Sequence, residues 1–250
     1  MTIRMIKSLK RLAAAALFAP ALAFGAAASV DLDRAPVSTD PASLQHGAKL
    51  FVNYCLNCHS ASFVRYNKLT EIGLSEDDIR DNLMFTGERV GDLMTIAMRP
   101  GESKAWFGAT PPDLSLIARQ RNSGDGSGAD WLYTYLRQFY RDESRPTGWN
   151  NVIFENVGMP HVLWELQGEQ VAEITEGGHG KEVKLTLAKP GLMSADEYDQ
   201  AVADLVSFLV WMGEPVAEKR KAIGIYVLLF LVVFTGIAYA LKKNYWKDIH

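Results

Sequence analysis

Apolar residues are concentrated at the two ends of this 250-residue chain, and between the ends they recur with helical spacing. Residues 222–241 form an apolar run without a single charge, long enough to cross a bilayer as a helix at about 1.5 Å rise per residue. Basic residues flank the run, and apolar residues occupy every face, which disfavours the alternative of a buried core helix. The pattern therefore predicts one C-terminal transmembrane helix.

The N-terminal apolar run has a different character. Residues 1–28 join four basic residues to an alanine-rich stretch, Leu12 to Phe24, and then to small residues, which is the order of a secretory signal peptide. The stretch is short for a permanent span, so an uncleaved anchor is the less favoured alternative. We expect cleavage near the end of this segment, export of residues 29–221, and a cytoplasmic tail over residues 242–250.

Between the ends, polar caps and apolar spacing predict helices and one hairpin. Asp40 and Pro41 suit the first positions of a helix that ends at the two cysteines, and Ser75 suits the N-cap of a short helix. Met94 and Met98, four residues apart, predict one face of another helix. The remaining predicted elements are a helix within 128–142, a strand over 182–188 paired with the segment before it, and a capped helix over 194–214.

Composition and charge change this picture in one respect. The chain is 48% hydrophobic and 22% charged, with a formal net charge of −3, which is ordinary for a folded protein. Without the four positive charges of the leader and the net two positive charges after residue 221, residues 29–221 carry −9. We expect no nucleic-acid partner for such an acidic domain. The charge favours a basic soluble partner, although keeping the domain soluble is the more common role of a charged surface.

Both cysteines of the chain lie in one short motif, Cys55-Leu-Asn-Cys58-His59. A C-x-x-C pair followed directly by histidine is typical of covalent attachment of a c-type haem, in which each thiol bonds to a vinyl group and the imidazole binds the iron. A disulfide is possible in an oxidising compartment. Zinc would need two further ligands, and a thioredoxin-like pair would need a βαβ setting. The motif predicts one haem c, with His59 as an iron ligand.

The second axial ligand is predicted from the stretch NVGMPHVLW. Met159 and His161 stand there in a segment punctuated by Gly158 and Pro160, the kind of loop that can place a ligand against a cofactor. A thioether favours reduced iron and raises the potential, whereas a second imidazole would lower it. Met159 is the preferred ligand, and His161 remains its rival.

The stretch PPDLSLIARQR is a candidate for the haem environment. Pro111 and Pro112 force an extended segment, and Arg119 and Arg121 follow shortly after it. Haem propionates are carboxylates that are costly to bury without donors, and an arginine fork suits them. Two solvated arginines are the alternative.

Several of these stretches together resemble the cytochrome c1 family, the haem c subunits of the cytochrome bc1 complex, which is a ubiquinol:cytochrome c oxidoreductase. The resemblance covers most of residues 35–247. It is carried by CLNCHS, RYNKL, MRPG, PPDLSLIARQR, GMP and the closing MSADEYDQAVADLVSFLVWMGEPVAEKRKAIG. The arginine block and the helix that runs into the anchor are more particular to this family than the haem motif alone.

The resemblance implies a mostly α fold: a class I cytochrome c-like haem domain with inserted loops and one C-terminal transmembrane helix. It implies electron transfer from a Rieske iron–sulfur subunit to a soluble or tethered cytochrome c, beside a cytochrome b subunit. The family's location implies a bacterial inner membrane with the haem domain in the periplasm. The Gly-rich segment 173–191 resembles an insertion with no known role. The implied site residues are Cys55 and Cys58 for the thioethers, His59 and Met159 for the iron, and Arg121, rather than Arg119, for a propionate near Pro112.

Electron transfer needs no acid, base or nucleophile, so no catalytic side chain is expected in this subunit. Two other functions remain open from the sequence. One is a membrane-tethered electron shuttle outside any quinol-oxidising complex, although such tethers usually have a flexible linker. The other is a haem enzyme with an open iron site, which a ligand-binding spectrum would reveal.

Overall fold

The computed structural model describes residues 31–177 and 180–247. The predicted signal peptide lies outside the described residues, as do the last three residues of the predicted tail. Helices dominate the regular structure, joined by three two-stranded sheets in the described part of the chain. The expected class, a mostly α domain with one long apolar C-terminal helix, is confirmed.

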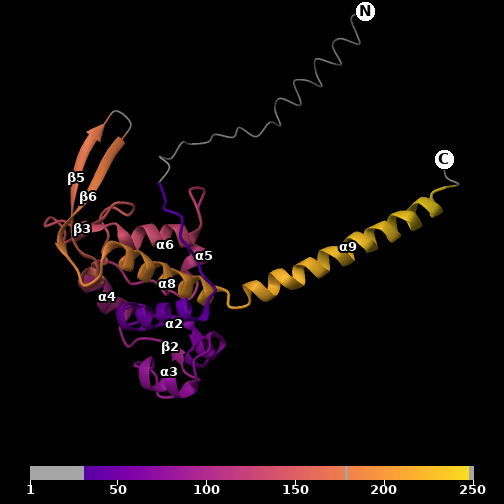
Figure 1. The fold of residues 1–250 in the computed structure, drawn as a ribbon, viewed down its shortest axis with the longest axis horizontal. Coiled ribbons are helices and arrows are strands. Elements are labelled where there is room, and N and C mark those ends of the chain that lie inside the picture. The colour runs from indigo at the N-terminus through magenta and orange to yellow at the C-terminus, as the bar shows by residue number, and fades with distance from the viewer. Residues whose placement is uncertain (1–30, 178–179, 248–250) are drawn as a thin grey trace, which may run out of the picture. The chain divides into compact units, whose positions relative to one another are not determined.

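Two helices far apart in sequence, α2 (Pro41–Leu50) and α8 (Ala195–Gly213), pack against each other at the centre of the fold (Figure 1). The predicted caps are confirmed: the Asp40 carboxylate accepts hydrogen bonds from the first turn of α2, and Ser194 forms a capping box at the start of α8. At the crossing, a Cβ on Gly47 would lie 2.1 Å from the carbonyl oxygen of Asp204. Only glycine allows this approach without a backbone shift.

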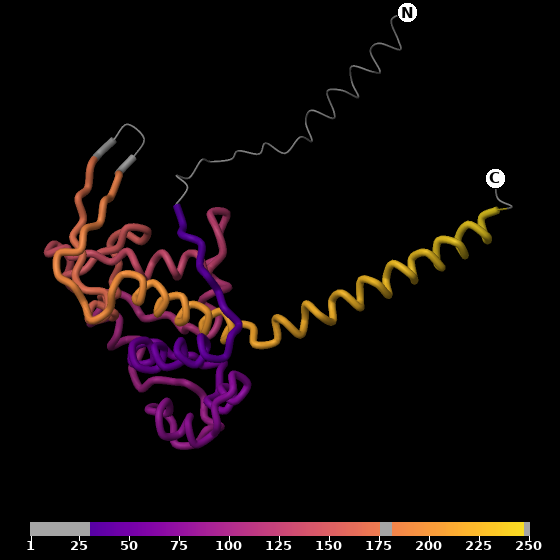
Figure 2. The backbone as a smooth tube through the Cα atoms, in the orientation of Figure 1, coloured from indigo at the N-terminus to yellow at the C-terminus, as the bar shows by residue number. Residues whose placement is uncertain are grey.

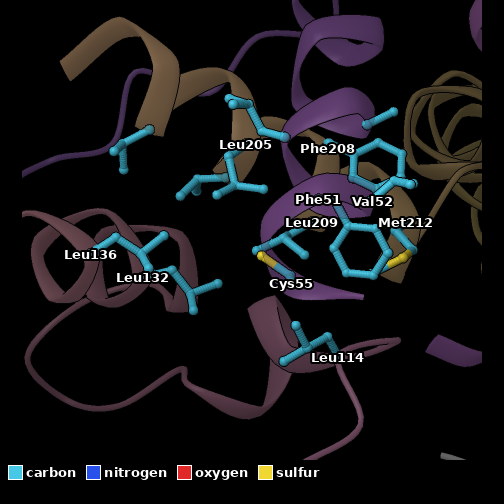
Figure 3. Packing of buried hydrophobic residues seen from close by; sticks show 14 of the residues in the cluster. Phe51, Val52, Cys55, Leu114, Leu132, Leu136, Leu205, Phe208, Leu209 and Met212 are labelled. Carbon is cyan, nitrogen blue, oxygen red and sulfur yellow. The ribbon is translucent and has the colours of Figure 1, made fainter. Parts of the chain in front are cut away.

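The main core forms where α2, α6 and α8 meet. Figure 3 shows residues of this core, with Phe51, the first residue after α2, against Phe208 and Met212 of α8. The Phe51 and Phe208 rings lie 5.5 Å apart, centre to centre. Each fully buried side chain of this size stabilises the fold by about 1.5–3 kcal/mol. Cys55 is part of the same apolar cluster, so the first cysteine of the motif is anchored in the core.

After α2 the chain widens into a π-helical turn, η1 (Phe51–Cys55), and then continues in a series of short elements. These are β1 (Ala61–Arg65), the 3₁₀ helix η2 (Tyr66–Ile72), α3 (Glu76–Asn82), β2 (Leu93–Met94) and α4 (Pro100–Phe107). The predicted helical face of Met94 and Met98 is wrong. Met94 pairs with Ala61 across β1 and β2, and the proline at position 100 disfavours helix just before it.

The next elements along the chain are α5 (Ile117–Gln120), α6 (Gly128–Arg137), β3 (Phe139–Arg141), β4 (Trp149–Asn151) and α7 (Trp164–Gln167). β3 and β4 pair in antiparallel register, with Tyr140 opposite Asn150. α6 begins with a capping box between Ser127 and Asp130, which confirms the predicted helix in this region. The helix places Trp131 and Tyr135 one turn apart, facing the segment that follows β4.

The predicted hairpin is confirmed as β5 (Gly168–Gly177) and β6 (Gly180–Pro190), which extend away from the helices (Figures 1 and 2). The root of the hairpin, Glu169 and Gln170, contacts the domain: the Gln170 side-chain amide donates to the carbonyls of Arg137 and Phe139. Beyond the root, the strands contact mainly each other. The hairpin is therefore a locally folded appendage of the domain.

The C-terminal helix α9 (Ala217–Tyr245) contains the whole predicted apolar run 222–241. Its 29 residues have a mean hydropathy of 2.4 in the most apolar window, and none is buried against the rest of the protein. The helix is long and apolar enough to cross a membrane. Residues 214–216 join it to α8, so two helices meet at a short corner.

Candidate haem site

The two thiols lie on one tight turn at the end of η1. The N–H groups of Cys58 and His59 both donate to the carbonyl of Cys55, at 3.0 and 2.9 Å, which winds the motif around the end of the helix. Both cysteines are free; Cys55 is buried and Cys58 is partly buried. Burial raises the pKa of the Cys55 thiol to about 12, and it also raises the pKa of Cys58. Both sulfurs are therefore neutral thiols at neutral pH.

The His59 ring has a defined tautomer because of its partner. Its Nδ1 lies 2.7 Å from the carbonyl oxygen of Pro112, which can only accept, so the proton is on Nδ1 and the lone pair is on Nε2. Burial lowers the pKa of His59, against the opposing effect of this hydrogen bond, and keeps the ring neutral. The arrangement presents one imidazole nitrogen as a free ligand, held by an outer hydrogen bond.

The segment that carries Pro112 is itself fixed by side chains. The Asp113 carboxylate accepts from the N–H groups of Ser62 and Ser115, each at 2.8 Å, and the Leu114 N–H donates to the Ser60 carbonyl. Burial opposes charge on Asp113, but hydrogen bonds from Ser115 and Ser62 outweigh it and hold the pKa of the carboxyl below its usual range. These hydrogen bonds hold residues 60–62, which directly follow His59, against residues 112–115.

Met159 lies partly buried in the segment after β4, where its sulfur accepts a hydrogen bond of 3.5 Å from the Tyr135 hydroxyl. A Cβ on Gly158 would lie 2.8 Å from the carbonyl of Phe107, so this glycine permits close packing against the end of α4. Tyr135 belongs to α6 and is buried, which raises its pKa well above the usual tyrosine value despite the opposing charge of Arg121. The phenol is a neutral donor to the thioether.

His161, the rival ligand, occupies an aromatic cluster. Its ring stacks on Phe139 at 5.0 Å with the planes 5° apart, and it meets the Trp149 ring edge-on at 5.0 Å. The side chain is 2% exposed, and its Nε2 has no hydrogen-bond partner among the described residues. Burial lowers the pKa of His161 to about 4, against the effect of the Gln167 side chain. A neutral ring packed on one face and one edge has the surroundings of a core residue.

The structure separates the two arginines that the sequence placed together. Arg119 forms an ion pair with Glu214 at 3.0 Å, at the corner between α8 and α9. Arg121 instead stacks its guanidinium 4.3 Å above the centre of the Trp131 ring, and its buried Nε has no hydrogen-bond partner among the described residues. An unpaired buried donor on a cation matches the need of a buried carboxylate.

Two residues near this site have roles that the local sequence pattern does not indicate. The apolar stripe of residues 128–142 predicts only a core position for Tyr135, and the position of Asp113 before Leu114 predicts only a helix cap. Tyr135 donates to Met159, 24 positions away in sequence, and Asp113 accepts from Ser62, 51 positions away. No local pattern indicates either contact. Pro112 was expected near the cofactor, and its carbonyl turns out to be the acceptor for His59.

Comparison with known proteins finds one family model and several similar proteins. The sequence model described as the Cytochrome C1 family matches residues 33–180 and 192–249. Cytochrome c1 of Allochromatium vinosum is 45% identical over 94% of this chain and 96% of its own length. A Nitrosomonas europaea protein named ammonia monooxygenase gamma subunit is 53% identical over 98% of this chain and 100% of its own. Cytochrome c1 of Rhodospirillum rubrum is 28% identical over 84% and 83%. Residues 181–191, which form most of β6, fall in the gap of the family match.

Proposed function

The chain belongs to the cytochrome c1 family, whose members are electron-transfer subunits of the bc1 complex, and from this premise we propose how its own residues hold one haem c and pass electrons. A covalently bound haem c is what family membership implies. When bound, the haem supplies an iron that cycles between ferric and ferrous states one electron at a time. Side chains of this protein would set the position of the haem and its reduction potential.

The observation that carries the proposal is the hydrogen bond from His59 to the Pro112 carbonyl, beside two free thiols. Cys55 and Cys58 would form the two thioether links, and Nε2 of His59 would bind the iron. The residues fit the group because the ring is neutral, its free nitrogen is defined, and both thiols lie on the adjacent turn. Outer-shell bonding of this kind orients a histidine ligand and strengthens it as a donor.

Met159 is proposed as the second iron ligand. Its side chain is partly buried in a loop. A thioether ligand on haem iron favours the ferrous state. His161 is less suited, because its ring is packed among aromatic side chains on its face and its edge. Two axial ligands from the chain would leave no open coordination position, as an electron carrier needs.

Arg121 is proposed as the partner of a haem propionate, because its buried Nε lacks a partner and its position over Trp131 is fixed. Arg119 is proposed to act elsewhere, in the ion pair with Glu214. Pro112 belongs to the haem environment through its carbonyl. No side chain of this chain needs to move a proton for the electron to pass.

The chain's partners follow from family membership at the level of the complex: a cytochrome c1 is a subunit of bc1. We propose a Rieske iron–sulfur subunit as the electron donor, a cytochrome b subunit as a neighbour, and a basic cytochrome c as the acceptor. The −9 charge of residues 29–221 would speed encounter with a basic acceptor, and added salt would slow it.

Within residues 31–177 and 180–247, one apolar helix is suited to anchor the protein in a membrane. We propose that residues 1–28 are removed on export, that residues 29–221 form the haem domain in the periplasm, and that residues 222–241 cross the inner membrane. The tail, residues 242–250, would then lie in the cytoplasm. A reporter fused after residue 250, active only in the cytoplasm, tests this orientation.

Purification of the native membrane protein tests the proposed function. We expect a low-spin c-type optical spectrum that does not change with CO, and co-purification with a b-type cytochrome and an iron–sulfur subunit. Isolation without those subunits would favour the tethered shuttle, and CO binding would favour a haem enzyme. The name of the Nitrosomonas relative gives a second candidate, a monooxygenase subunit. Co-purification with a monooxygenase would support that candidate instead.

A further inference from the structure

We propose that Tyr135 is a positioning residue for Met159: its hydroxyl holds the thioether sulfur and weakens it as an electron donor, which raises the reduction potential of the bound haem. This inference rests on the proposed function, in which Met159 binds the iron. It assigns a role to a residue that neither the motif nor the family match singles out.

The contact joins two separate parts of the fold. Tyr135 stands in the last turn of α6, and Met159 lies in the segment that follows β4, with an oxygen-to-sulfur distance of 3.5 Å. A thioether can only accept a hydrogen bond, so the phenol is the donor. Tyr135 is 8% exposed, which leaves the hydroxyl few competing partners in water.

The ring that carries this donor is held on several sides. Trp131 stacks on it at 4.7 Å with the planes 15° apart, and Phe139 meets it edge-on at 5.0 Å. The guanidinium of Arg121 covers Trp131 at 4.3 Å. The backbone is fixed as well, because the Tyr135 carbonyl accepts from the Asn151 amide at 2.8 Å. The hydroxyl is therefore aimed at the sulfur before any cofactor binds.

The chemistry follows from the sulfur atom. A thioether sulfur has two lone pairs, so one can accept the phenol proton while the other remains available to a metal. Donation to the first pair draws electron density from the sulfur and makes it a poorer donor. Ferric iron gains more from a strong donor than ferrous iron does, so the weakened sulfur favours the ferrous state. The same bond restricts the Met159 side chain to one orientation.

The test compares two tyrosines of the same helix in the full-length, haem-loaded protein. Tyr135→Phe removes only the hydroxyl. Tyr133→Phe makes the same change two positions away, where the ring lies against Arg137 at 4.4 Å. The readouts are the midpoint potential from a redox titration and the sulfur-to-iron charge-transfer band of the ferric protein.

We expect Tyr135→Phe to keep its haem and low-spin spectrum, to move the ferrous–ferric equilibrium toward ferric by about two- to tenfold, and to shift the charge-transfer band. Tyr133→Phe should leave both readouts at the wild-type values. Equal potentials in the three proteins would overturn the proposal, and so would an equal shift in both variants, because that would reflect general loosening of α6.

A second measurement needs no variant. If the phenol donates to the ligand sulfur, exchange of the wild-type protein into D₂O shifts the iron–sulfur vibration in a resonance Raman spectrum. No isotope shift contradicts the proposal even if Tyr135→Phe fails to fold. Failure of the underlying function has a different signature: Met159→Leu would then leave the charge-transfer band and the CO response unchanged.

Discussion

Nδ1 of His59 donates a 2.7 Å hydrogen bond to the carbonyl of Pro112, a residue 53 positions further along the chain. The bond fixes the tautomer of the histidine by the position of a main-chain atom. It therefore depends on whatever keeps the Pro112 segment in place, which is chiefly the carboxylate of Asp113. Because no substitution can remove a backbone carbonyl, the effect of this bond is best tested through Asp113.

Asp113→Ala should destabilise the domain by about 1–3 kcal/mol, since it leaves the N–H groups of Ser62 and Ser115 without their partner. Denaturant unfolding of the purified protein measures this loss. Asp77→Ala is the control, because the Asp77 side chain is 81% exposed and pairs only on the surface of α3. The folded-state pKa of Asp113 is lowered, so its contribution is present above about pH 4 and disappears as the pH falls through the folded value. An unchanged difference between wild type and Asp113→Ala in acid would contradict this account.

Met159→Leu should open the sixth position of the iron and lower the midpoint potential, because leucine cannot coordinate. A CO-difference spectrum should change from silent to reactive. His161→Phe should remain silent toward CO, since the new ring can keep the stacking on Phe139. CO reactivity in His161→Phe and not in Met159→Leu would reverse the ligand assignment.

His161 should make stability dependent on pH. The folded-state pKa is lowered to about 4, so between about 6.5 and 4 the unfolded chain binds a proton that the folded chain does not. Wild-type stability therefore falls as the pH drops through this window, by up to about 3 kcal/mol. Melting temperatures of wild type and His161→Phe from pH 7 to 4 measure the effect. The slope should flatten in the variant, and parallel curves would rule out this role for His161.

Arg121→Gln should destabilise the haem-loaded protein by about 1.5–3 kcal/mol and lower its potential, because the partly buried cation proposed to bind a haem propionate is lost. Arg119→Gln is the matched control, since its partner is Glu214 at the corner of the helices. Redox titration and thermal melting separate the two variants. Identical behaviour of both variants would contradict the proposed role of Arg121 as the partner of a haem propionate.

Replacing the distal hairpin, residues 172–185, by a short Gly-Ser link should leave the haem spectrum unchanged and the melting temperature nearly so. The removed residues contact mainly each other, whereas the root residues Glu169 and Gln170 keep their bonds to Arg141 and Phe139. Optical spectra and calorimetry test this. Loss of haem incorporation would mean that the hairpin supports the fold in a way its contacts do not reveal.

Local signals in the sequence predicted the elements that depend on neighbouring residues. Asp40 and Ser194 cap helices through atoms two or three positions away, and the alternation of 182–188 predicted a strand. The cofactor motif could be interpreted for the same reason, since its three side chains lie on one turn. Met94 was mispredicted because its spacing from Met98 fits a helix, and only pairing with Ala61 makes it a strand.

The rest of the site depends on contacts that local pattern does not encode. The donor to Met159 comes from another element, and the acceptor for His59 is a backbone atom in an irregular segment. Arg119, in α5, pairs with Glu214, whereas Arg121, at the C-cap of α5, stacks on Trp131, because the two side chains point in different directions. These relationships become visible only when the helices are packed.

The corner between α8 and α9 limits how the haem domain can travel. Residues 214–216 span at most about 10 Å, and Glu214 pairs with Arg119 of the domain and with Arg220 at the start of the anchor helix. A domain on so short a link cannot sweep through a large volume in search of another protein. Under the proposed function, encounter with a soluble electron acceptor would then depend mainly on diffusion of that acceptor, so crowding that slows the acceptor should lower the rate of turnover.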